Sequence, residues 1–281
     1  MELKLLKEKG KDVRLVVFDL DGTLLNSKSK ISYHSKLAIN ELRKKGIKIA
    51  IASGRIFTML KSFYEDLNLK DFVISSNGAA IDDLTTNQPI QQLFAYPEDS
   101  KKVVEFCVEN HIECNILKRN ACYFQEYSAR LAKFNLYNEH AVEQNSEPID
   151  IVIYEHGIDH YEGIEKLLIY ETNSTKTKKV QRFVDQNTKL IHMTSGEGYV
   201  DISAVGVSKG EAVKKIAEYM NIGIEQVCVF GDYDNDISML EVAGISVVMS
   251  NGTKNALKYA DFITLSNDDE GIAYAIKELL L

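Results

Sequence analysis

Residues 13–25 read VRLVVFDLDGTLL, and they give the clearest indication of the fold class. Its first half, through Phe18, is apolar and rich in β-branched residues, which is typical of a strand buried on both faces of a parallel sheet. Two aspartates, Asp19 and Asp21, follow where the strand gives out, and strand alternation predicts that both carboxylates point to one side. In open α/β sheets ligands bind outside the carboxyl ends of the strands, so we expect a site here.

Strands and helices alternate on both sides of this stretch. Apolar runs predict further strands at residues 47–52, 72–75, 226–230, 245–249 and 262–265. Helical spacing and caps predict helices at about 32–45, 57–67 and 209–220. A further helix is expected to end at residue 243, and a last one lies at the C-terminal end. This alternation predicts a doubly wound, mainly parallel α/β sheet.

Residues 84–205 have a different pattern. Shorter alternating strands such as DIVIYE and KLLIYE occur there, together with all three prolines of the chain. A composition shift of this kind predicts an inserted α+β domain. We therefore expect a core domain formed by residues 1–83 and 206–281, with residues 84–205 as the insertion, which suits the length of 281 residues.

Composition limits the partners. A formal net charge of -8 disfavours nucleic acid and anionic membranes as partners, so an anionic ligand must meet local cations or a metal. The four cysteines form no CxxC pair and are expected to be reduced packing residues. No signal peptide and no run of ~18 apolar residues is found, so we expect a cytoplasmic protein, with a short amphipathic helix at its start.

A second acidic group, GDYDND at residues 231–236, follows the strand QVCVF. Taken alone, the DxDG segment is more often a solvated turn, but a second acidic strand end weakens that interpretation. Like carboxylates 4 Å apart repel by about 4 kcal/mol per pair at an effective dielectric near 20, unless a proton or a cation intervenes. Because only oxygen donors are on offer, Mg²⁺ is favoured over zinc, and calcium fits less well.

Two further strand or helix ends carry polar groups. Ser53 and Gly54 follow the strand at 47–52, where a hydroxyl and backbone N–H groups would cradle phosphate; a simple helix-capping serine is the alternative. Ser208 and Glu211 form a capping box that puts Lys209 in the first turn of a helix, where the helix dipole disfavours a cation. Lys209 is therefore expected either to face the carboxylates and a bound phosphate or to be a solvated surface residue.

Five motifs in order resemble one family. They are DLDGTLL at 19–25, ASGR at 52–55, SNGA at 76–79, VSKG at 207–210 and GDYDNDISML at 231–240. The chain resembles the haloacid dehalogenase-like hydrolases, of the Cof-like branch, whose Rossmann-type core carries a large cap inserted after the third strand. The resemblance covers nearly the whole chain and is weakest in the insertion and the first twelve residues.

The resemblance implies a mechanism. Asp19 would attack phosphorus to form an aspartyl-phosphate, and Asp21 would act as the acid and then the base. Mg²⁺ would be held by the carboxylates of Asp19 and Asp232 and by the backbone carbonyl of Asp21. Asp236 would orient the metal shell, and Asn235 would donate a hydrogen bond to the phosphate or to a metal-bound water. Ser53, Gly54 and Lys209 would contact the phosphate.

The implied substrate is a small phosphorylated metabolite, such as a sugar phosphate, and the inserted domain would close over it and select the leaving group. Lys118, Arg119 and Tyr123 could contact it there or be solvated. A metal role for His156 and His160 is disfavoured, because the residues between them suit a turn. A phosphomutase and a non-catalytic binding or regulatory protein stay open as alternatives, and we expect a monomer or a small homo-oligomer.

Overall fold

The computed structural model describes residues 3–143 and 147–281 and contains two compact units. The first consists of Met1–Ser53, Phe63–Ile90 and Ser208–Leu281, and the second of Gly54–Ser62 and Gln91–Val207. The segment 54–62, which follows the second strand of the core, thus belongs to the second unit. The expected division into domains at residues 83/84 and 205/206 stays a prediction, because compactness does not show that either part folds alone.

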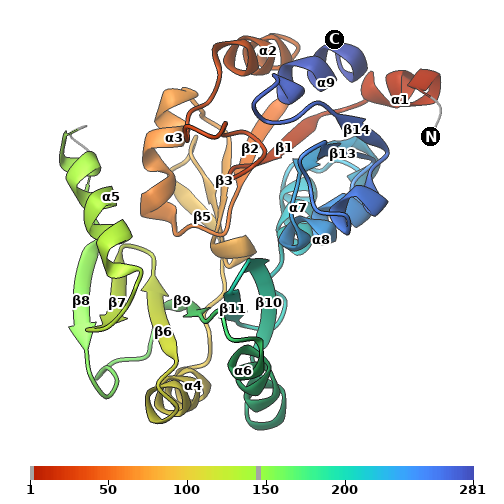
Figure 1. Cartoon of the computed structure of the whole chain (residues 1–281). Helices are drawn as coiled ribbons and strands as arrows, with labels where there is room; N and C mark the ends of the chain where they lie inside the picture. The colour runs from red at the N-terminus through yellow and green to blue at the C-terminus, as the bar shows by residue number, and fades with distance from the viewer. Residues whose placement is uncertain (1–2, 144–146) are drawn as a thin grey trace. The chain divides into compact units, whose positions relative to one another are not determined.

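The first unit is built on an eight-stranded sheet within the described residues, in the order β14-β13-β12-β1-β2-β3-β4-β5. Its strands are β1 Leu15–Asp19, β2 Lys48–Ala52, β3 Phe72–Ser75, β4 Ala80–Asp83, β5 Gln88–Gln92, β12 Val227–Gly231, β13 Ile245–Met249 and β14 Phe262–Thr264. Pairing is parallel from β14 through β3 and antiparallel between β3 and β4. The predicted α/β fold with a mainly parallel sheet is confirmed (Figure 1).

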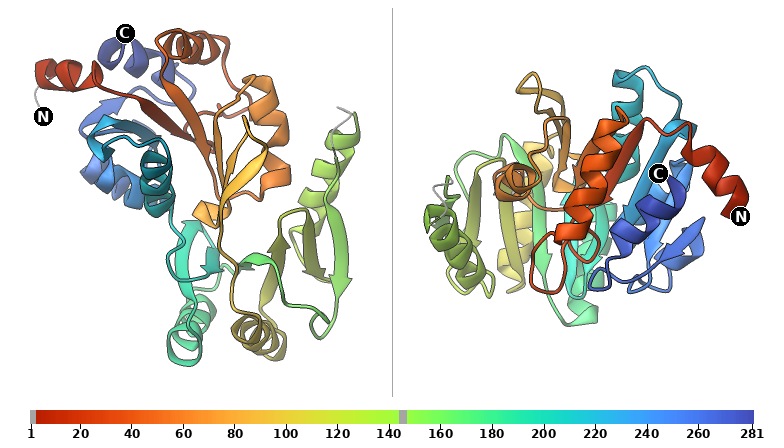
Figure 2. Two further views of the ribbon diagram at one scale, coloured as in Figure 1. Left: turned by 180° about the vertical axis from the view of Figure 1, so that it is seen from behind. Right: turned by 90° about the horizontal axis from the view of Figure 1, so that it is seen from above.

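Helices cover this sheet. They are α1 Leu3–Gly10, α2 Tyr33–Lys44, α3 Lys61–Asp66, α7 Lys209–Tyr219, α8 Ile237–Val242 and α9 Gly271–Leu279. Apolar residues of α7 and α8 pack on one set of alternating strand residues, among them Leu15, Val17 and Val229. Figures 1 and 2 show α2 and α9 side by side, with α1 close to α9, apart from α7 and α8.

Local signals explain most helix boundaries. The hydroxyl of Ser32 accepts a hydrogen bond from the Ser35 backbone N–H at 3.0 Å, which confirms the predicted cap of α2. The single helix expected from Phe57 to Leu67 instead starts as a 3₁₀ turn, η1 Phe57–Leu60, and continues as α3. The residue before that turn is Ile56, without a side-chain cap, so Ser53 is not a helix-capping serine.

The second unit holds a six-stranded sheet among the described residues, in the order β10-β11-β9-β6-β7-β8. Its elements are α4 Pro97–Glu109, β6 Glu113–Lys118, β7 Ala121–Gln125, α5 Leu131–Glu143, β8 Asp150–Tyr154, β9 Ile164–Tyr170, α6 Ser174–Asn187, β10 Ile191–Gly196 and β11 Tyr199–Ser203. Neighbouring strands pair antiparallel except β7 and β8, which run parallel. This mixed α+β architecture matches the pattern predicted for the insertion.

Two apolar clusters stabilise the second unit. Cys114 and Ile116 of β6 pack with Val104 of α4, whereas Leu117 packs with Phe134 of α5, because successive strand residues face opposite ways. All four cysteines of the chain are buried and unpaired, which confirms their packing role: Cys107, Cys114, Cys122 and Cys228.

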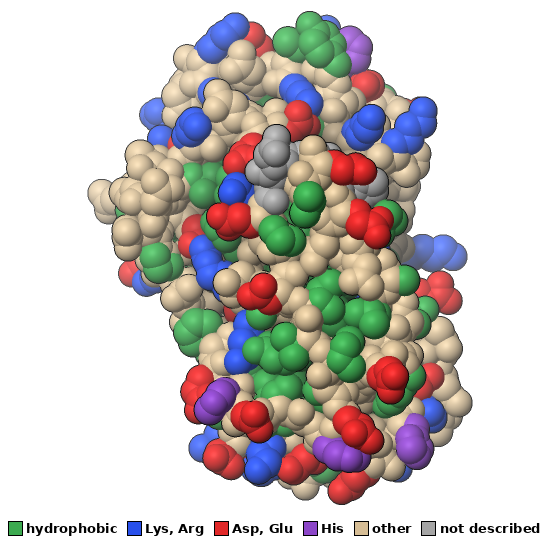
Figure 3. Space-filling view, turned by 90° about the vertical axis from the view of Figure 1, so that its left-hand side faces the viewer, with side chains coloured by type: hydrophobic (Ala, Val, Ile, Leu, Met, Phe, Trp, Pro, Cys, Tyr) green, Lys and Arg blue, Asp and Glu red, His purple; other side chains and the backbone are tan. Residues whose placement is uncertain are grey.

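Some apolar surface stays exposed. The edge strand β8 leaves Val152 and Ile153 40% and 49% exposed. Figure 3 shows hydrophobic side chains gathered between scattered charges on one face of the molecule. No helix in the described part of the chain has the length and apolar character needed to cross a bilayer.

Candidate active site

Polar residues of the first unit meet at the carboxyl edge of its parallel sheet. Asp19 is the last residue of β1 and lies opposite Ala52 of β2, which Ser53 follows. On the other side, Phe18 of β1 pairs with Phe230 of β12, and Asp232 comes just after that strand. Asp19, Ser53 and Asp232 are each less than 8% exposed. Parallel pairing therefore puts three polar strand ends at one buried edge.

Lys209 joins this edge from the first residue of α7. Ser208 caps the helix by accepting from the Glu211 N–H at 3.1 Å, which sets the Lys209 side chain in the first turn. The Lys209 ammonium donates to Asp19 Oδ1 and to Asp236 Oδ1, at 2.5 Å each. Its side chain is 0% exposed, so the alternative of a solvated surface lysine is wrong.

Asp236 is held on both of its oxygens. Oδ1 accepts from Lys209, while Oδ2 accepts from the backbone N–H groups of Asp232 and Tyr233 at 2.9 and 3.0 Å. The carboxylate is completely buried. Because its acceptor positions are engaged by protein donors, Asp236 suits the role of fixing Lys209 and the Asp232 backbone better than that of a direct metal ligand.

Asp232 is held by the turn after β1. Thr23 Oγ1 donates to Asp232 Oδ1 at 2.6 Å. Gly22 has φ +88°, and a Cβ there would lie 2.5 Å from Asp232 Oδ2, so no other residue fits without a shift. The glycine of the DLDGT motif thus allows the backbone to approach the second acidic motif closely.

The charges of the cluster do not balance. Burial raises the pKa of Asp19 well above its usual range, Asp236 and Asp232 add to the effect, and Lys209 opposes it. Burial and the Asp236 charge raise the pKa of Asp232 to about 6, opposed by the Thr23 hydrogen bond. The neighbouring carboxylates raise the pKa of Lys209 despite its burial, so it is a permanent cation. One lysine therefore faces three carboxylates.

The donor set fits a divalent cation. Oxygens of Asp19, Asp232 and Asp236 lie within 4.8 Å of one another, and all three residues are buried. Ionised together with Lys209 they leave an excess of two negative charges, which a divalent ion would neutralise. Oxygen-only donors favour a hard cation of the Mg²⁺ class. Asp19 and Asp232 are the residues best placed to hold it, given the bonds that occupy Asp236.

The other predicted site residues, Asp21, Asn235 and Gly54, differ in how the structure places them relative to the carboxylate cluster. Asp21 is exposed, lies beyond the end of β1 and is outside the carboxylate cluster. Asn235 lies in the 3₁₀ turn η4 Asp234–Asp236, shortly after Asp232, and donates to Asn77 Oδ1 at 3.1 Å. Gly54 opens the segment that groups with the second unit, so its backbone N–H is not placed relative to the cluster.

Sequence reasoning missed two members of this site, Thr23 and Asn77. Both stand inside motifs already quoted, DLDGT and SNGA. Asn77 adopts φ +58°, a left-handed conformation that asparagine tolerates better than most residues. The Asn-Gly dipeptide at 77–78, just after the strand at 72–75, is typical of a turn and was the sequence signal that could have identified it.

In the second unit, all three polar residues considered for substrate contact, Lys118, Arg119 and Tyr123, have contacts within the unit. Lys118 donates to the His160 carbonyl at 2.9 Å and lies over the Tyr123 ring, and the Arg119 guanidinium stacks 3.9 Å from the Phe57 ring centroid. His156 is exposed. None of these contacts assigns a binding role.

The chain is similar to known proteins over nearly its whole length. Residues 16–276 match the family model of haloacid dehalogenase-like hydrolases. Phosphatase YwpJ of Bacillus subtilis is 28% identical over 301 residues, covering 95% of this chain and 100% of its own. The 5-amino-6-(5-phospho-D-ribitylamino)uracil phosphatase YwtE of the same organism is 28% identical, covering 95% and 98%. A solved haloacid dehalogenase-like hydrolase from B. subtilis superposes with a TM-score of 0.83 at 26% identity, covering 95% and 100%.

Proposed function

The chain belongs to the haloacid dehalogenase-like hydrolase family and is an enzyme of its phosphatase class, and from this premise we propose that it is a Mg²⁺-dependent phosphatase of small phosphorylated metabolites. The observation that carries the proposal is the Lys209 bridge between Asp19 and Asp236 beside Asp232. A buried acidic cluster with one resident cation suits the binding of a further cation and a phosphate.

Asp19 is the proposed nucleophile. Its carboxylate attacks phosphorus, the bond to the leaving oxygen breaks, and an aspartyl-phosphate results. Only the ionised carboxylate can attack, and the Lys209 ammonium at 2.5 Å favours that form against the effect of burial. Water then attacks the phosphorus of the aspartyl-phosphate, which releases phosphate and restores the Asp19 carboxylate.

Asp21 is the proposed acid and base. It gives a proton to the leaving alkoxide and takes one from the attacking water in the second half-reaction. Its exposure, in contrast to the buried Asp19, suits a group that exchanges protons with substrate and solvent.

Asp19, Asp232 and the backbone carbonyl of Asp21 are the proposed Mg²⁺ ligands. Bound Mg²⁺ would supply the positive charge that lets an anionic carboxylate approach an anionic phosphate. Asp236 fixes Lys209 and the Asp232 backbone. Ser53, Gly54, Lys209 and Asn235 are the proposed donors to the phosphate oxygens.

The proposed substrates are phosphomonoesters of sugars or polyols. The ribitylamino group in the name of the relative YwtE supports a polyol phosphate among them. The second unit is the proposed cap that selects the leaving group. A cytoplasmic location and a monomer or small homo-oligomer stay predictions.

A phosphatase screen tests this function. The full chain is incubated with Mg²⁺ and a panel of sugar, polyol and aryl phosphates, and released phosphate is measured together with any isomerised substrate. We expect free phosphate from at least one substrate, none from Asp19→Asn, and loss of release in EDTA. An isomer without net phosphate release would favour a phosphomutase, and inactivity on the whole panel would favour a binding protein.

A further inference from the structure

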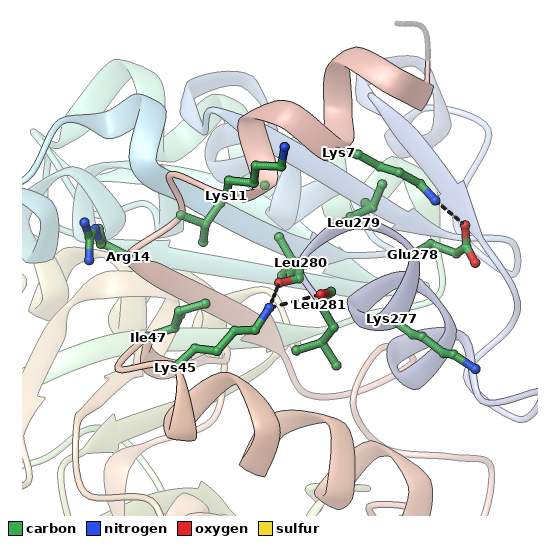
Figure 4. A pocket seen from close by; sticks show the side chains of 12 residues that line it. Lys7, Lys11, Arg14, Lys45, Ile47, Lys277, Glu278, Leu279, Leu280 and Leu281 are labelled. Atoms are coloured by element: carbon green, nitrogen blue, oxygen red, sulfur yellow. Dashed lines mark hydrogen bonds and ion pairs between the residues drawn. The ribbon is translucent and has the colours of Figure 1, made fainter.

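A basic pocket lies at the edge of the first unit opposite the carboxylate cluster. It has a volume of about 540 Å³ and is lined by residues of α1, of the chain entering β1, of the end of α2 and of α9. Its lining includes five cationic residues and one acidic residue, Glu278: the cations are Lys7, Lys11, Arg14, Lys45 and Lys277. Figure 4 shows these side chains, with Arg14 at one end of the group and Lys277 at the other. Such a surplus stands out on a chain of net charge -8.

The cations of this basic pocket are only partly engaged. Lys7 pairs with Glu278 at 3.1 Å, and Lys45 donates to the carbonyls of Leu280 and Leu281 at 2.9 and 3.1 Å (Figure 4). Lys11 pairs with Glu8 at 2.8 Å. Within residues 3–143 and 147–281, Arg14 and Lys277 make no side-chain ion pair or hydrogen bond. The two are exposed and available to an external anion.

The floor of the pocket is apolar and firmly built. Val13, Ile47, Leu279 and Leu280 line it and are each at most 7% exposed. A Cβ at Gly10 would lie 1.9 Å from the Leu279 carbonyl oxygen, so α1 closes directly onto the end of α9. The N-terminal helix, to which the proposed chemistry gives no role, is thus a wall of this pocket.

Its position separates the pocket from the chemistry. Arg14 immediately precedes β1, and Asp19 ends that strand five residues later. At about 3.3 Å per residue, the two backbone positions lie roughly 17 Å apart. A small molecule seated on Arg14 therefore could not reach the Asp19 carboxylate.

We propose that this basic pocket binds a phosphate-rich organic anion of the nucleotide class. The cations match two or more phosphate groups, arginine in particular pairing with phosphate through two parallel hydrogen bonds. The apolar floor and a volume within the usual range of small-molecule sites match the organic part. A bound anion would relieve repulsion among the cations and hold α1 against α9.

Calorimetric titration of the full chain with ADP in EDTA tests the proposal. EDTA removes divalent ions, so binding at the acidic edge is disfavoured. We expect one ADP per chain in the wild type. Arg14→Gln/Lys277→Gln should weaken ADP binding about tenfold or more, since two charge-assisted contacts are lost. Because neither side chain has an ion-pair partner among the described residues, this variant should fold and retain phosphatase activity.

Lys214→Gln/Lys215→Gln is the matched control. It removes the same charge from exposed lysines of α7, outside the pocket, and should change ADP affinity less than about twofold. No ADP binding by the wild type, or equal weakening by both double variants, would overturn the proposal. The proposal would also be overturned if the wild type did not bind ADP but bound phosphatidylserine vesicles through Arg14 and Lys277, because the basic residues would then bind a membrane surface.

Discussion

Each unit of the molecule buries a lysine against aspartate, and the two arrangements differ in charge balance. In the second unit, Lys166 of β9 meets Asp201 of β11 at 2.8 Å, with side chains 5% and 0% exposed. In the first unit, Lys209 is equally buried but bridges Asp19 and Asp236, with Asp232 close by. The Lys166 pair is neutral as it stands. The Lys209 cluster keeps an excess of negative charge.

The difference separates a structural pair from a reactive site. A neutral buried pair satisfies its own charges, and apolar residues of similar volume often replace such a pair without loss of stability. An unbalanced cluster costs free energy in the folded protein, and that cost is relieved only by protons, by a metal or by a ligand. Surplus charge at a strand edge, rather than burial of a lysine, is what indicates function here.

The largest expected effect is on turnover. Lys209→Met should lower phosphatase activity at least about a hundredfold, because a donor to the phosphate and the cation beside the nucleophile disappear together. Lys166→Met/Asp201→Leu should change the rate on a small aryl phosphate less than about fivefold. Steady-state kinetics with Mg²⁺ measure both, and circular dichroism checks that both fold. Comparable losses of turnover in the two variants would remove the distinction between the sites.

The next effect concerns stability in the second unit. Lys166→Met alone leaves Asp201 buried without its cation and should cost about 3–5 kcal/mol of unfolding free energy. The double variant Lys166→Met/Asp201→Leu should recover most of that loss, because neither charge of the pair is then buried without the other. Urea unfolding of the full chain measures both. If the double variant proves as unstable as the single one, the Lys166 pair is more than a self-contained structural pair.

Metal should stabilise only the unbalanced cluster. At a Mg²⁺ concentration a hundred times the dissociation constant, the wild type should gain about 2.7 kcal/mol, seen as a higher melting temperature. Asp232→Asn removes a proposed ligand and should lose most of this gain. Asp201→Asn in the second unit is the control, and it should keep the Mg²⁺-induced shift whatever its own stability. If Asp232→Asn keeps the Mg²⁺-induced rise in melting temperature, the metal binds elsewhere.

The smallest effect is a pH dependence. Because the pKa of Asp232 is raised to about 6, the folded protein holds a proton there that the unfolded chain releases near pH 4. Without metal, this group should lower the unfolding free energy as pH rises from about 4 to about 6, by an amount on the order of 2 kcal/mol. Asp19, whose pKa is also raised, acts in the same direction.

Urea unfolding in EDTA across this pH window measures the slope. Asp232→Asn has no proton to lose and should flatten the curve. Mg²⁺ requires ionised carboxylates, so its stabilising effect should grow as pH rises through the same window. A slope unchanged in Asp232→Asn would show that other groups set the pH dependence.

Sequence patterns predicted the framework of the site better than its details. Continuous apolar runs indicated β1 and β12, and parallel pairing then implied that Asp19 and Asp232 end at one edge. The unfavourable first-turn position of Lys209 predicted a compensating partner, and two carboxylates compensate it. These inferences succeed because strand ends and helix caps are local in sequence.

Other features depend on contacts that no local pattern encodes. The hydrogen bond from Thr23 to Asp232 joins residues 209 positions apart. The helix expected from Phe57 begins instead as the 3₁₀ turn η1, and Ile56 and Met59 at this turn pack in a cluster with residues distant in sequence, such as Phe124. The basic pocket gathers its cations from separate segments of the chain, each unremarkable alone.

The most direct test of the central claim is chemical trapping at Asp19. The enzyme is mixed with Mg²⁺ and its best substrate, quenched in acid during turnover, reduced with borohydride and analysed by peptide mass spectrometry. Borohydride converts an aspartyl-phosphate to homoserine, and we predict this conversion at residue 19, in amounts that depend on substrate. Turnover with no modification at Asp19, or with modification at another residue, would contradict the account.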